Sequence, residues 1–266
     1  MLLDINDKIL TQEYDDFIAQ SGFGNFYQSR QWSEIKNNWK CHYFYLQDQG
    51  EIRAAMSVLS VTDSTAGKEF FYAPRGPVCD LADLETVTTL IDEAKAYAAA
   101  HNGFLLRIDP EVEHNDELVS RYARAGLHFL KNPALSSQPL MSLILKINGR
   151  SAEEILADFD KNTRYEIRSS YRRQVEPFLG SRADLETFYK FMVEMSASKS
   201  IGHRPLDYFQ RVYDTYSDTS RLQFARYDGE LIAGALLIGF NKTLTYLYGA
   251  DPIHVRQNQS AQIQYE

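Results

Sequence analysis

The sequence predicts an α/β protein with two similar domains in tandem, each a mixed β-sheet flanked by helices. The main observation is a repeated segment, which reads GEIRAAMSVL at 50–59 and GELIAGALLI at 229–238. Each copy follows an apolar, aromatic run and a turn containing Asp and Gly, which is typical of a β-hairpin. A third apolar run then ends in aromatic residues and a glycine, at 70–76 and again at 244–249. Because hairpins also recur by chance, the repeat alone leaves both explanations open.

The first half of the chain has a regular order of predicted elements. Apolar residues at helical spacing predict helices at 11–20 and 30–39, the second carrying Trp32, Ile35 and Trp39 on one face. Hairpin strands at 43–46 and 50–59 and a strand at 70–76 follow. The remaining elements are a helix at 84–100, a buried strand at 104–108 before Asp109 and Pro110, a helix at 115–125 and a strand at 141–147. The first domain is therefore predicted at 1–147.

The second half repeats this order. Ser151 and Glu154 form the pattern of a capping box, and the helix that they begin is predicted to run to Arg173. Ser181 precedes a helix with four apolar residues on one face, Leu185, Phe188, Met192 and Met195. Pro205 is placed at the first position of the next helix, where proline is favoured. Helices, hairpin and strand in the same order favour a duplication, with the second domain at 148–266.

Composition excludes several classes of protein. The 266 residues are 44% hydrophobic, which is enough for a sizeable core. A net charge of −8 argues against general DNA affinity, because phosphate binding needs clustered Lys and Arg. We see no signal peptide, and the apolar run 235–238 is too short to cross a bilayer. The two cysteines form no metal-ligand pattern, so we expect a cytoplasmic protein without a metal.

The segment HRPLDYFQR at 203–211 is a candidate anion-binding site. With Pro205 as the first helical residue, Arg204 would be the N-cap, at the positive end of the helix dipole. Tyr208 and Arg211 would lie on the same face as Arg204, and together these groups suit a phosphate or a carboxylate. A surface arginine that pairs with a nearby aspartate is the competing interpretation.

Three further features have two interpretations each. Lys161, Arg164, Arg168 and Arg172 form one basic stripe, which is either a phosphate-binding patch or a solvated helix face. Lys36 lies beside the aromatic pair Trp32 and Trp39, either as a ligand or as a solvated lysine. Tyr246 and Tyr248 are two residues apart on a strand and should share one face, as a binding wall or as core.

The hairpin followed by a broken strand resembles acetyltransferases of the GNAT type. These enzymes bind the CoA pyrophosphate on a loop of the form [RQ]-x-x-G-x-[GA] that opens a helix. The corresponding residues here are Arg256 to Ala261, with Gln259 where glycine is needed, and the first half has Pro77, which lacks an N–H donor. Neither half therefore favours CoA, and no cofactor is predicted.

Five stretches together resemble the FemABX family of peptidoglycan-bridge aminoacyltransferases, closest to its FemX-like branch: WSEIKNNW (32–39), YAPRGPV (72–78), LLRIDPEV (105–112), HRPLDYFQR (203–211) and YLYGA (246–250). The resemblance implies two GNAT-like domains and transfer of Ala, Ser or Gly from aminoacyl-tRNA. The acceptor would be the third-residue side-chain amine of UDP-MurNAc-pentapeptide or of a lipid-linked precursor, forming the interpeptide bridge.

The resemblance also implies site residues. Lys36, Arg204, Tyr208 and Tyr248 match the positions at which this branch contacts the precursor, and Arg75 stands where it has a lysine. The stripe of Lys161, Arg164, Arg168 and Arg172 would bind tRNA, and no catalytic residue is identified. Family members continue past the position of Glu266, so we expect the second domain to be incomplete. A GNAT-type N-acyltransferase using acyl-CoA and a non-catalytic precursor- or tRNA-binding protein are the alternatives.

Overall fold

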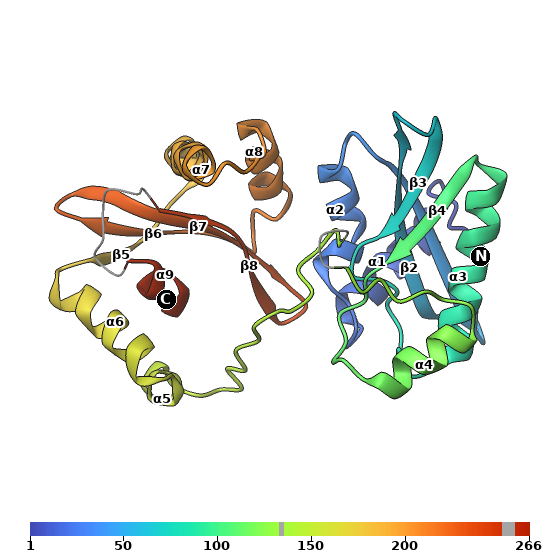
Figure 1. Ribbon diagram of the computed structural model, residues 1–266, viewed down its shortest axis with the longest axis horizontal. Helices are drawn as coiled ribbons and strands as arrows, with labels where there is room; N and C mark the ends of the chain where they lie inside the picture. The colour runs from blue at the N-terminus through green and yellow to red at the C-terminus, as the bar shows by residue number, and fades with distance from the viewer. Residues whose placement is uncertain (133–135, 252–258) are drawn as a thin grey trace. The chain divides into compact units, whose positions relative to one another are not determined.

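The computed structural model describes residues 1–132, 136–251 and 259–266, and the chain divides into two compact units, Met1–Ser142 and Leu143–Glu266. Each unit contains a four-stranded sheet flanked by helices, which confirms the predicted α/β class (Figure 1). The sheet of unit 1 is mixed, as predicted, whereas the four described strands of unit 2 are all antiparallel. None of the described helices is long and apolar enough to cross a membrane.

Unit 1 is ordered around a sheet with the strand order β1-β2-β3-β4, in which only β3 and β4 are parallel. The helix α3 makes the connection between these two strands. The elements are α1 (Lys8–Gln20), η1 (Phe26–Gln28), α2 (Arg30–Ile35), β1 (Lys40–Asp48), β2 (Glu51–Asp63), β3 (Lys68–Ala73), α3 (Leu84–Ala100), β4 (Gly103–Ile108) and α4 (Asp116–Arg124).

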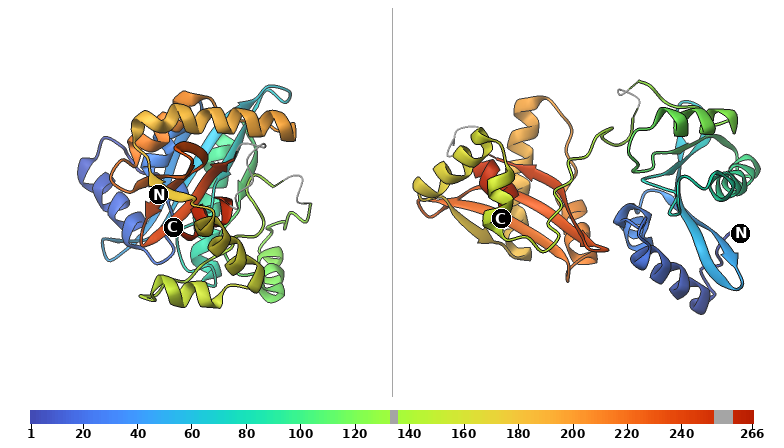
Figure 2. Two further views of the ribbon diagram at one scale, coloured as in Figure 1. Left: turned by 90° about the vertical axis from the view of Figure 1, so that its left-hand side faces the viewer. Right: turned by 90° about the horizontal axis from the view of Figure 1, so that it is seen from below.

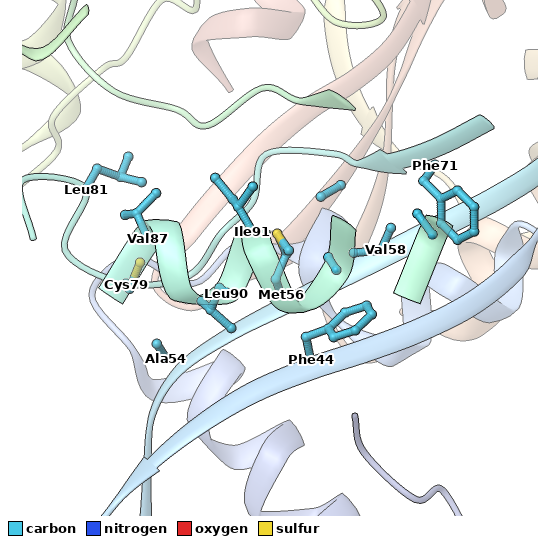
Figure 3. Packing of buried hydrophobic residues seen from close by; sticks show 13 residues of the cluster. Phe44, Ala54, Met56, Val58, Phe71, Cys79, Leu81, Val87, Leu90 and Ile91 are labelled. Atoms are coloured by element: carbon cyan, nitrogen blue, oxygen red, sulfur yellow. The ribbon is translucent and has the colours of Figure 1, made fainter. Parts of the chain in front are cut away.

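The core of unit 1 lies between the sheet and α3. Alternate residues of the strands, including Phe44, Met56 and Phe71, pack against Leu90 and Ile91 of the helix (Figure 3). The opposite face of the sheet meets α1 and α2, which lie across the strands from α3 (Figure 2). The sheet is therefore covered on both faces over β1 and β2.

Unit 2 has a sheet with the order β5-β6-β7-β8. Its elements are α5 (Ala152–Asp158), α6 (Lys161–Arg172), β5 (Glu176–Leu179), η3 (Arg182–Asp184), α7 (Leu185–Lys199), α8 (Leu206–Thr215), β6 (Ser220–Tyr227), β7 (Glu230–Phe240), β8 (Thr243–Ala250) and α9 (Gln259–Tyr265). Helices α7 and α8 cover one face of the sheet and α9 the other (Figure 1). Phe188 of α7 packs beside Gly234, and Ile263 of α9 joins the core with Ala235.

The repeated segment forms the same hairpin in both units. Residues Gln49 and Gly50 take φ values of 49° and 87°, and Asp228 and Gly229 take 49° and 81°. Two consecutive positive φ angles define the type I′ turn that matches the twist of a hairpin. The register also shifts two residues before each turn, between Leu46 and Gln47 and between Ala225 and Arg226. The two predicted hairpins are thus confirmed, with the same turn and the same bulge.

Several boundaries agree with the sequence. The helix predicted at 84–100 is α3, whose N-cap Asp83 accepts the N–H of Thr86. The predicted capping box is confirmed at the start of α5. The Ser151 hydroxyl accepts the backbone N–H of Glu154, and the Glu154 carboxylate accepts the backbone N–H of Ser151. The helix predicted after Ser181 begins with the short turn η3 and continues as α7.

Three predicted elements are wrong in length or kind. The helix predicted at 30–39 ends at Ile35, with Lys36 as its C-cap. The helix predicted to reach Arg173 is two helices, because Phe159 is extended and Asp160 starts α6 by accepting the N–H groups of Asn162 and Thr163. Residues 141–147 form no strand, and Met141 is 89% exposed.

Two other differences concern exposure and elements that were not predicted. The strand β4 exists, but Phe104 and Leu105 are 47% and 41% exposed instead of buried. The reason is that β4 lies at the edge of the sheet, where no described strand pairs with its outer side. The strand β5 and the helix α9 have no counterpart among the predicted elements.

Candidate functional site

Three of the predicted site residues come together in unit 2. The hydroxyl oxygens of Tyr208 on α8 and Tyr248 on β8 are 3.0 Å apart, and their rings meet edge to face. The guanidinium carbon of Arg204 lies 5.5 Å from the ring centroid of Tyr208. We call Arg204, Tyr208 and Tyr248 the arginine–tyrosine cluster. It places a cation and two hydroxyl groups within reach of one ligand.

Local structure fixes this cluster. Pro205 is the N-cap of α8 and Leu206 its first residue, so Arg204 precedes the cap by one residue, and the prediction that Arg204 itself is the N-cap is wrong. Tyr208 lies in the first turn, and its backbone N–H donates to the carbonyl of Pro205. Phe209 packs against Tyr248 with ring centroids 5.2 Å apart. The aromatic core under α8 thus holds both tyrosines.

A β-bulge separates Tyr246 from Tyr248. Tyr248 pairs with Leu236 and Tyr246 pairs with Leu237, so Leu247 is an extra residue in β8. Since neighbouring residues of β7 point to opposite faces, Tyr248 faces α8 and Tyr246 faces the side of α9. The prediction that the two tyrosines share one face is therefore wrong.

Arg211 is engaged with a neighbour on its own helix. Its guanidinium donates to the carboxylate of Asp207 over 2.6 Å. This ion pair holds the pKa of Asp207 below its ordinary value. The interpretation as an arginine that pairs with a nearby aspartate thus applies to Arg211, whereas Arg204 lies against Tyr208.

The basic stripe of α6 contains three exposed cations and one that has a structural contact. Lys161, Arg168 and Arg172 are exposed. Arg164 is half-buried and donates to the carbonyls of Ala157 and Phe159 at the end of α5. A cation at that place satisfies carbonyls that the end of a helix leaves without partners. The patch available to a ligand is therefore smaller than the sequence predicts.

Lys36 occupies the C-cap of α2 in unit 1. Its ammonium nitrogen lies 4.8 Å from the ring centroid of Trp32, a cation–π contact with a buried indole. The carbonyl of Lys36 accepts the backbone N–H of Trp39 over 2.8 Å, which closes the turn into β1. Lys36 is half-buried, and its cation is held beside an aromatic surface.

Arg75 lies in the loop after β3 and has a φ of 54°, the left-handed region. Its backbone N–H donates to Asp109 over 2.6 Å, and the hydroxyl of Tyr72 donates to the other oxygen of the same carboxylate over 2.5 Å. The Arg75 guanidinium donates to the carbonyl of Pro139. The motifs 72–78 and 105–112 thus meet at Asp109, as the parallel pairing of β3 and β4 requires.

A buried glutamine supports the same loop from below. Gln28 has no exposed surface, and its amide nitrogen donates to the carbonyls of Ser57 and Pro74. Its amide oxygen accepts the backbone N–H of Ser57. A Cβ atom on Gly76 would lie 2.6 Å from this amide, so glycine is required there. The loop of Arg75 is therefore fixed on two sides.

Asp109 and Gln28 are the residues that sequence reasoning missed. Asp109 was predicted only to stop a strand, and the available signal was an aspartate directly after a strand that ends beside β3. Burial raises the pKa of the Asp109 carboxyl, although its hydrogen bonds act in the opposite direction. The predicted counterpart of the CoA loop lies partly outside the described residues, at Arg256. Gln259 is described: it begins α9 and is buried.

Comparisons with known proteins identify the relatives of this chain. A profile described as the FemAB family matches residues 9–230. UDP-N-acetylmuramoylpentapeptide-lysine N(6)-alanyltransferase of Weissella viridescens is 33% identical over 263 residues, covering 93% of this chain and 76% of that protein. Lipid II:glycine glycyltransferase of Staphylococcus haemolyticus (strain JCSC1435) is 29% identical, covering 78% of this chain and 51% of that one. The chain thus spans about three quarters of the first relative and about half of the second.

Solved structures show the same fold. The crystal structure of FemX has a TM-score of 0.85 at 21% identity and covers 100% of this chain and 84% of that one. A tandem GNAT protein from the clavulanic acid biosynthesis pathway has a TM-score of 0.56 at 10% identity and covers 100% of this chain and 82% of that one. These neighbours confirm the predicted tandem GNAT-like architecture.

Removing the charge of Asp109 should change how stability depends on pH. Because the folded-state pKa is raised, the folded chain binds the proton more tightly than the unfolded chain. This contribution is full below the unfolded-state pKa and is lost as pH rises through the folded-state pKa. Relative to the parent, Asp109→Asn should therefore gain stability with rising pH over that range. Chemical denaturation at several pH values measures the difference in free energy of unfolding.

The matched variant Asp109→Ala separates charge from hydrogen bonding. It leaves the Tyr72 hydroxyl and the Arg75 N–H without their acceptor, which costs about 1–3 kcal/mol for each group that stays buried. It should be less stable than Asp109→Asn at every pH. If Asp109→Asn and the parent show the same pH profile, the buried charge has no energetic effect.

Proposed function

This chain belongs to the FemAB family, and on that premise we propose that it transfers an amino acid from aminoacyl-tRNA to a peptidoglycan precursor. The acceptor is the side-chain amine of the third residue of UDP-MurNAc-pentapeptide. A lipid-linked precursor is the alternative, because the staphylococcal relatives are named for lipid II. The main structural support for the proposal is the arginine–tyrosine cluster of unit 2.

The reaction exchanges one acyl bond for another. The neutral amine attacks the ester carbon, a C–N bond forms, and the C–O bond to the ribose of the tRNA breaks. The proton of the amine ends on the ribose oxygen. The ester is already activated, so holding amine and ester in line and stabilising the developing oxyanion can supply most of the catalysis. No general base is assigned.

The arginine–tyrosine cluster suits the anionic part of the precursor. The hydroxyls of Tyr208 and Tyr248 lie 3.0 Å apart, and each can both donate and accept a hydrogen bond. Arg204 adds a permanent cation, exposed and resting on the Tyr208 ring. A cation and a hydroxyl donor that converge on one place match a diphosphate better than an uncharged sugar.

Unit 1 contributes two further cations to this proposal. Lys36 is held above Trp32, and Arg75 stands on a loop that Asp109 and Gln28 fix. Both are preorganised, because their backbones are locked by hydrogen bonds before any ligand binds. On these contacts within unit 1, Lys36 and Arg75 are proposed as precursor-binding residues.

The exposed cations of α6 are the proposed contact for tRNA. Lys161, Arg168 and Arg172 provide positive charge in a chain whose net charge is −8. RNA phosphates need such a local patch, since the chain as a whole repels them. Arg164, predicted as a fourth member, is assigned to the end of α5 instead.

A transfer assay tests the proposed function directly. The chain is mixed with UDP-MurNAc-pentapeptide and with alanyl-, seryl- or glycyl-tRNA, and the product is weighed by mass spectrometry. We expect a precursor heavier by one amino-acid residue. Acetylation with acetyl-CoA in place of tRNA would identify a GNAT N-acyltransferase. Tight binding of the precursor without transfer from any tRNA would identify a binding protein.

Arg204→Ala should weaken precursor binding. The loss of a charge-assisted contact to an anion costs about 1.5–3 kcal/mol, which corresponds to about a ten- to hundredfold rise in Kd. Titration calorimetry with UDP-MurNAc-pentapeptide measures it. Arg182→Ala is the control, since Arg182 is paired with Asp214 away from the cluster. Equal affinity of Arg204→Ala and the control would remove Arg204 from the site.

We expect weaker tRNA binding and unchanged precursor binding when the three exposed cations of α6 are replaced together by glutamine. These cations are Lys161, Arg168 and Arg172. Each lost phosphate contact reduces the slope of log K against log salt by about 0.7–0.9. Binding is measured by filter retention between low and moderate salt. The control removes three other exposed cations of unit 2, Lys190, Lys199 and Arg221. If both triple variants give the parent slope, the stripe is a solvated helix face.

A further inference from the structure

Unit 1 contains a cavity that none of the proposed precursor-binding residues lines. Its volume is about 400 Å³, and its walls come from the loop before α3, the segment after β4 and the start of α4. One wall is apolar: Leu81 belongs to the core under α3 (Figure 3), while Phe23 and Val112 are 52% and 47% exposed. Exposed apolar side chains that gather around a hollow within a polar rim are typical of an interaction site.

The rim of the cavity is negatively charged. Four exposed carboxylates line it, Asp80, Glu111, Glu113 and Glu117. No ion pair among the described residues includes any of these four. Arg121 also lines the cavity, but its guanidinium donates to the carbonyl of Ala82 over 2.9 Å. The rim therefore offers several carboxylates to a cationic ligand.

The charge of the whole chain is concentrated on the same unit. Unit 1 has 20 Asp and Glu against 12 Lys and Arg, whereas unit 2 has 16 of each sign. The net charge of −8 thus belongs to unit 1. Charge of one sign raises the local concentration of partners of the opposite sign and speeds their association. Unit 1 is therefore suited to attract a basic partner.

Hydrogen bonds fix the walls of the cavity. The Tyr122 hydroxyl donates to the carbonyl of Leu81 over 2.8 Å, and Arg121 joins Ala82 of the same loop to α4. The Asn115 side chain caps α4 by accepting two N–H groups of its first turn. A hollow whose walls are held before binding costs less to fill than one that must first become ordered.

The arrangement argues against other classes of ligand. No group of three or more His, Cys, Asp and Glu among the residues that the structure describes is placed to hold a metal ion. A phosphate or a nucleotide would meet carboxylates and be repelled. Dispersed carboxylates around an apolar wall instead match cations spread along a chain, with an apolar group between them.

We propose that this cavity is a docking site on unit 1 for a basic peptide segment of a protein partner. An apolar side chain of the segment fills the hollow beside Phe23 and Val112. Lys or Arg residues on either side of it pair with Glu111, Glu113 and Glu117. The inference goes beyond the proposed function and does not depend on it, since none of the residues proposed for the precursor or for tRNA takes part.

The test uses the full chain and three synthetic hexapeptides. KKFLKK has both features of the proposed ligand, KKSSKK keeps the charge without the apolar anchor, and EEFLEE keeps the anchor with the charge reversed. Titration calorimetry gives Kd for each peptide at low and at moderate salt. We expect KKFLKK to bind at least about tenfold more tightly than either of the others, and more weakly as salt screens the rim.

Two variants remove the two features of the site separately. Glu111→Gln, Glu113→Gln and Glu117→Gln combined should weaken KKFLKK binding about tenfold, because three exposed ion pairs are lost, each of modest strength. Phe23→Ser should reduce the preference for KKFLKK over KKSSKK and leave KKSSKK binding unchanged. Exposed side chains are changed in both variants, so the fold should persist.

The matched control removes the same amount of charge elsewhere on unit 1. Glu13→Gln, Asp48→Asn and Glu51→Gln combined change three exposed carboxylates that do not line the cavity. This control should bind KKFLKK like the parent. An equal loss in the control and in the rim variant would mean that the peptide follows the overall charge, and the inference would be wrong.

Three further results would also overturn the inference. The first is no binding of KKFLKK, or equal binding of all three peptides. The second is competition between KKFLKK and UDP-MurNAc-pentapeptide, which would place the cavity in the acceptor site. The third is self-association of the parent in sedimentation that the rim variant abolishes, which would make a second copy of the chain the occupant. The transfer assay tests the proposed function independently of all of these.

Discussion

In unit 2 the position of Tyr248 depends on one extra residue in β8. Without the bulge at Leu247, Tyr246 and Tyr248 would keep the strict alternation of a strand and lie on one face. With it, Tyr248 reaches the hydroxyl of Tyr208 and the ring of Phe209. The arginine–tyrosine cluster therefore follows from the register of two strands, and α8 only supplies the partners. A change in that register would separate Tyr248 from Tyr208 and so break up the cluster, although the sequence itself would be unchanged.

Unit 1 positions its residues by a different means. Asp109 and Gln28 are side chains that accept or donate hydrogen bonds to the backbone of neighbouring segments. Such bonds are worth most where water is excluded, and their loss leaves buried groups without partners. The loop of Arg75 owes its left-handed backbone to this support, because a non-glycine residue avoids positive φ unless its surroundings impose it. Unit 2 thus positions its candidate site residues by strand register, and unit 1 positions Arg75 by hydrogen bonds from buried polar side chains.

The sequence predicts most elements where the signal is local. The helix α3 and both hairpins follow from a cap at Asp83 and from turns at Gln49–Gly50 and Asp228–Gly229. Features that depend on distant partners are missed. The apolar residues of 141–147 have the composition of a strand, but composition cannot supply a neighbouring strand to pair with. The bulge at Leu247 and the role of Asp109 are invisible for the same reason, since both arise from pairing between strands.

The two hairpins share one shape but close with different residues. Asp228 has a short polar side chain that tolerates the left-handed conformation, whereas Gln49 adopts the same φ of 49° without that advantage. The left-handed conformation is therefore less favourable for Gln49 than for Asp228. Asparagine at position 49 would give the preferred Asn-Gly pair of a type I′ turn. One substitution could therefore stabilise the turn of unit 1, whereas the turn of unit 2 already has a favoured Asp-Gly pair.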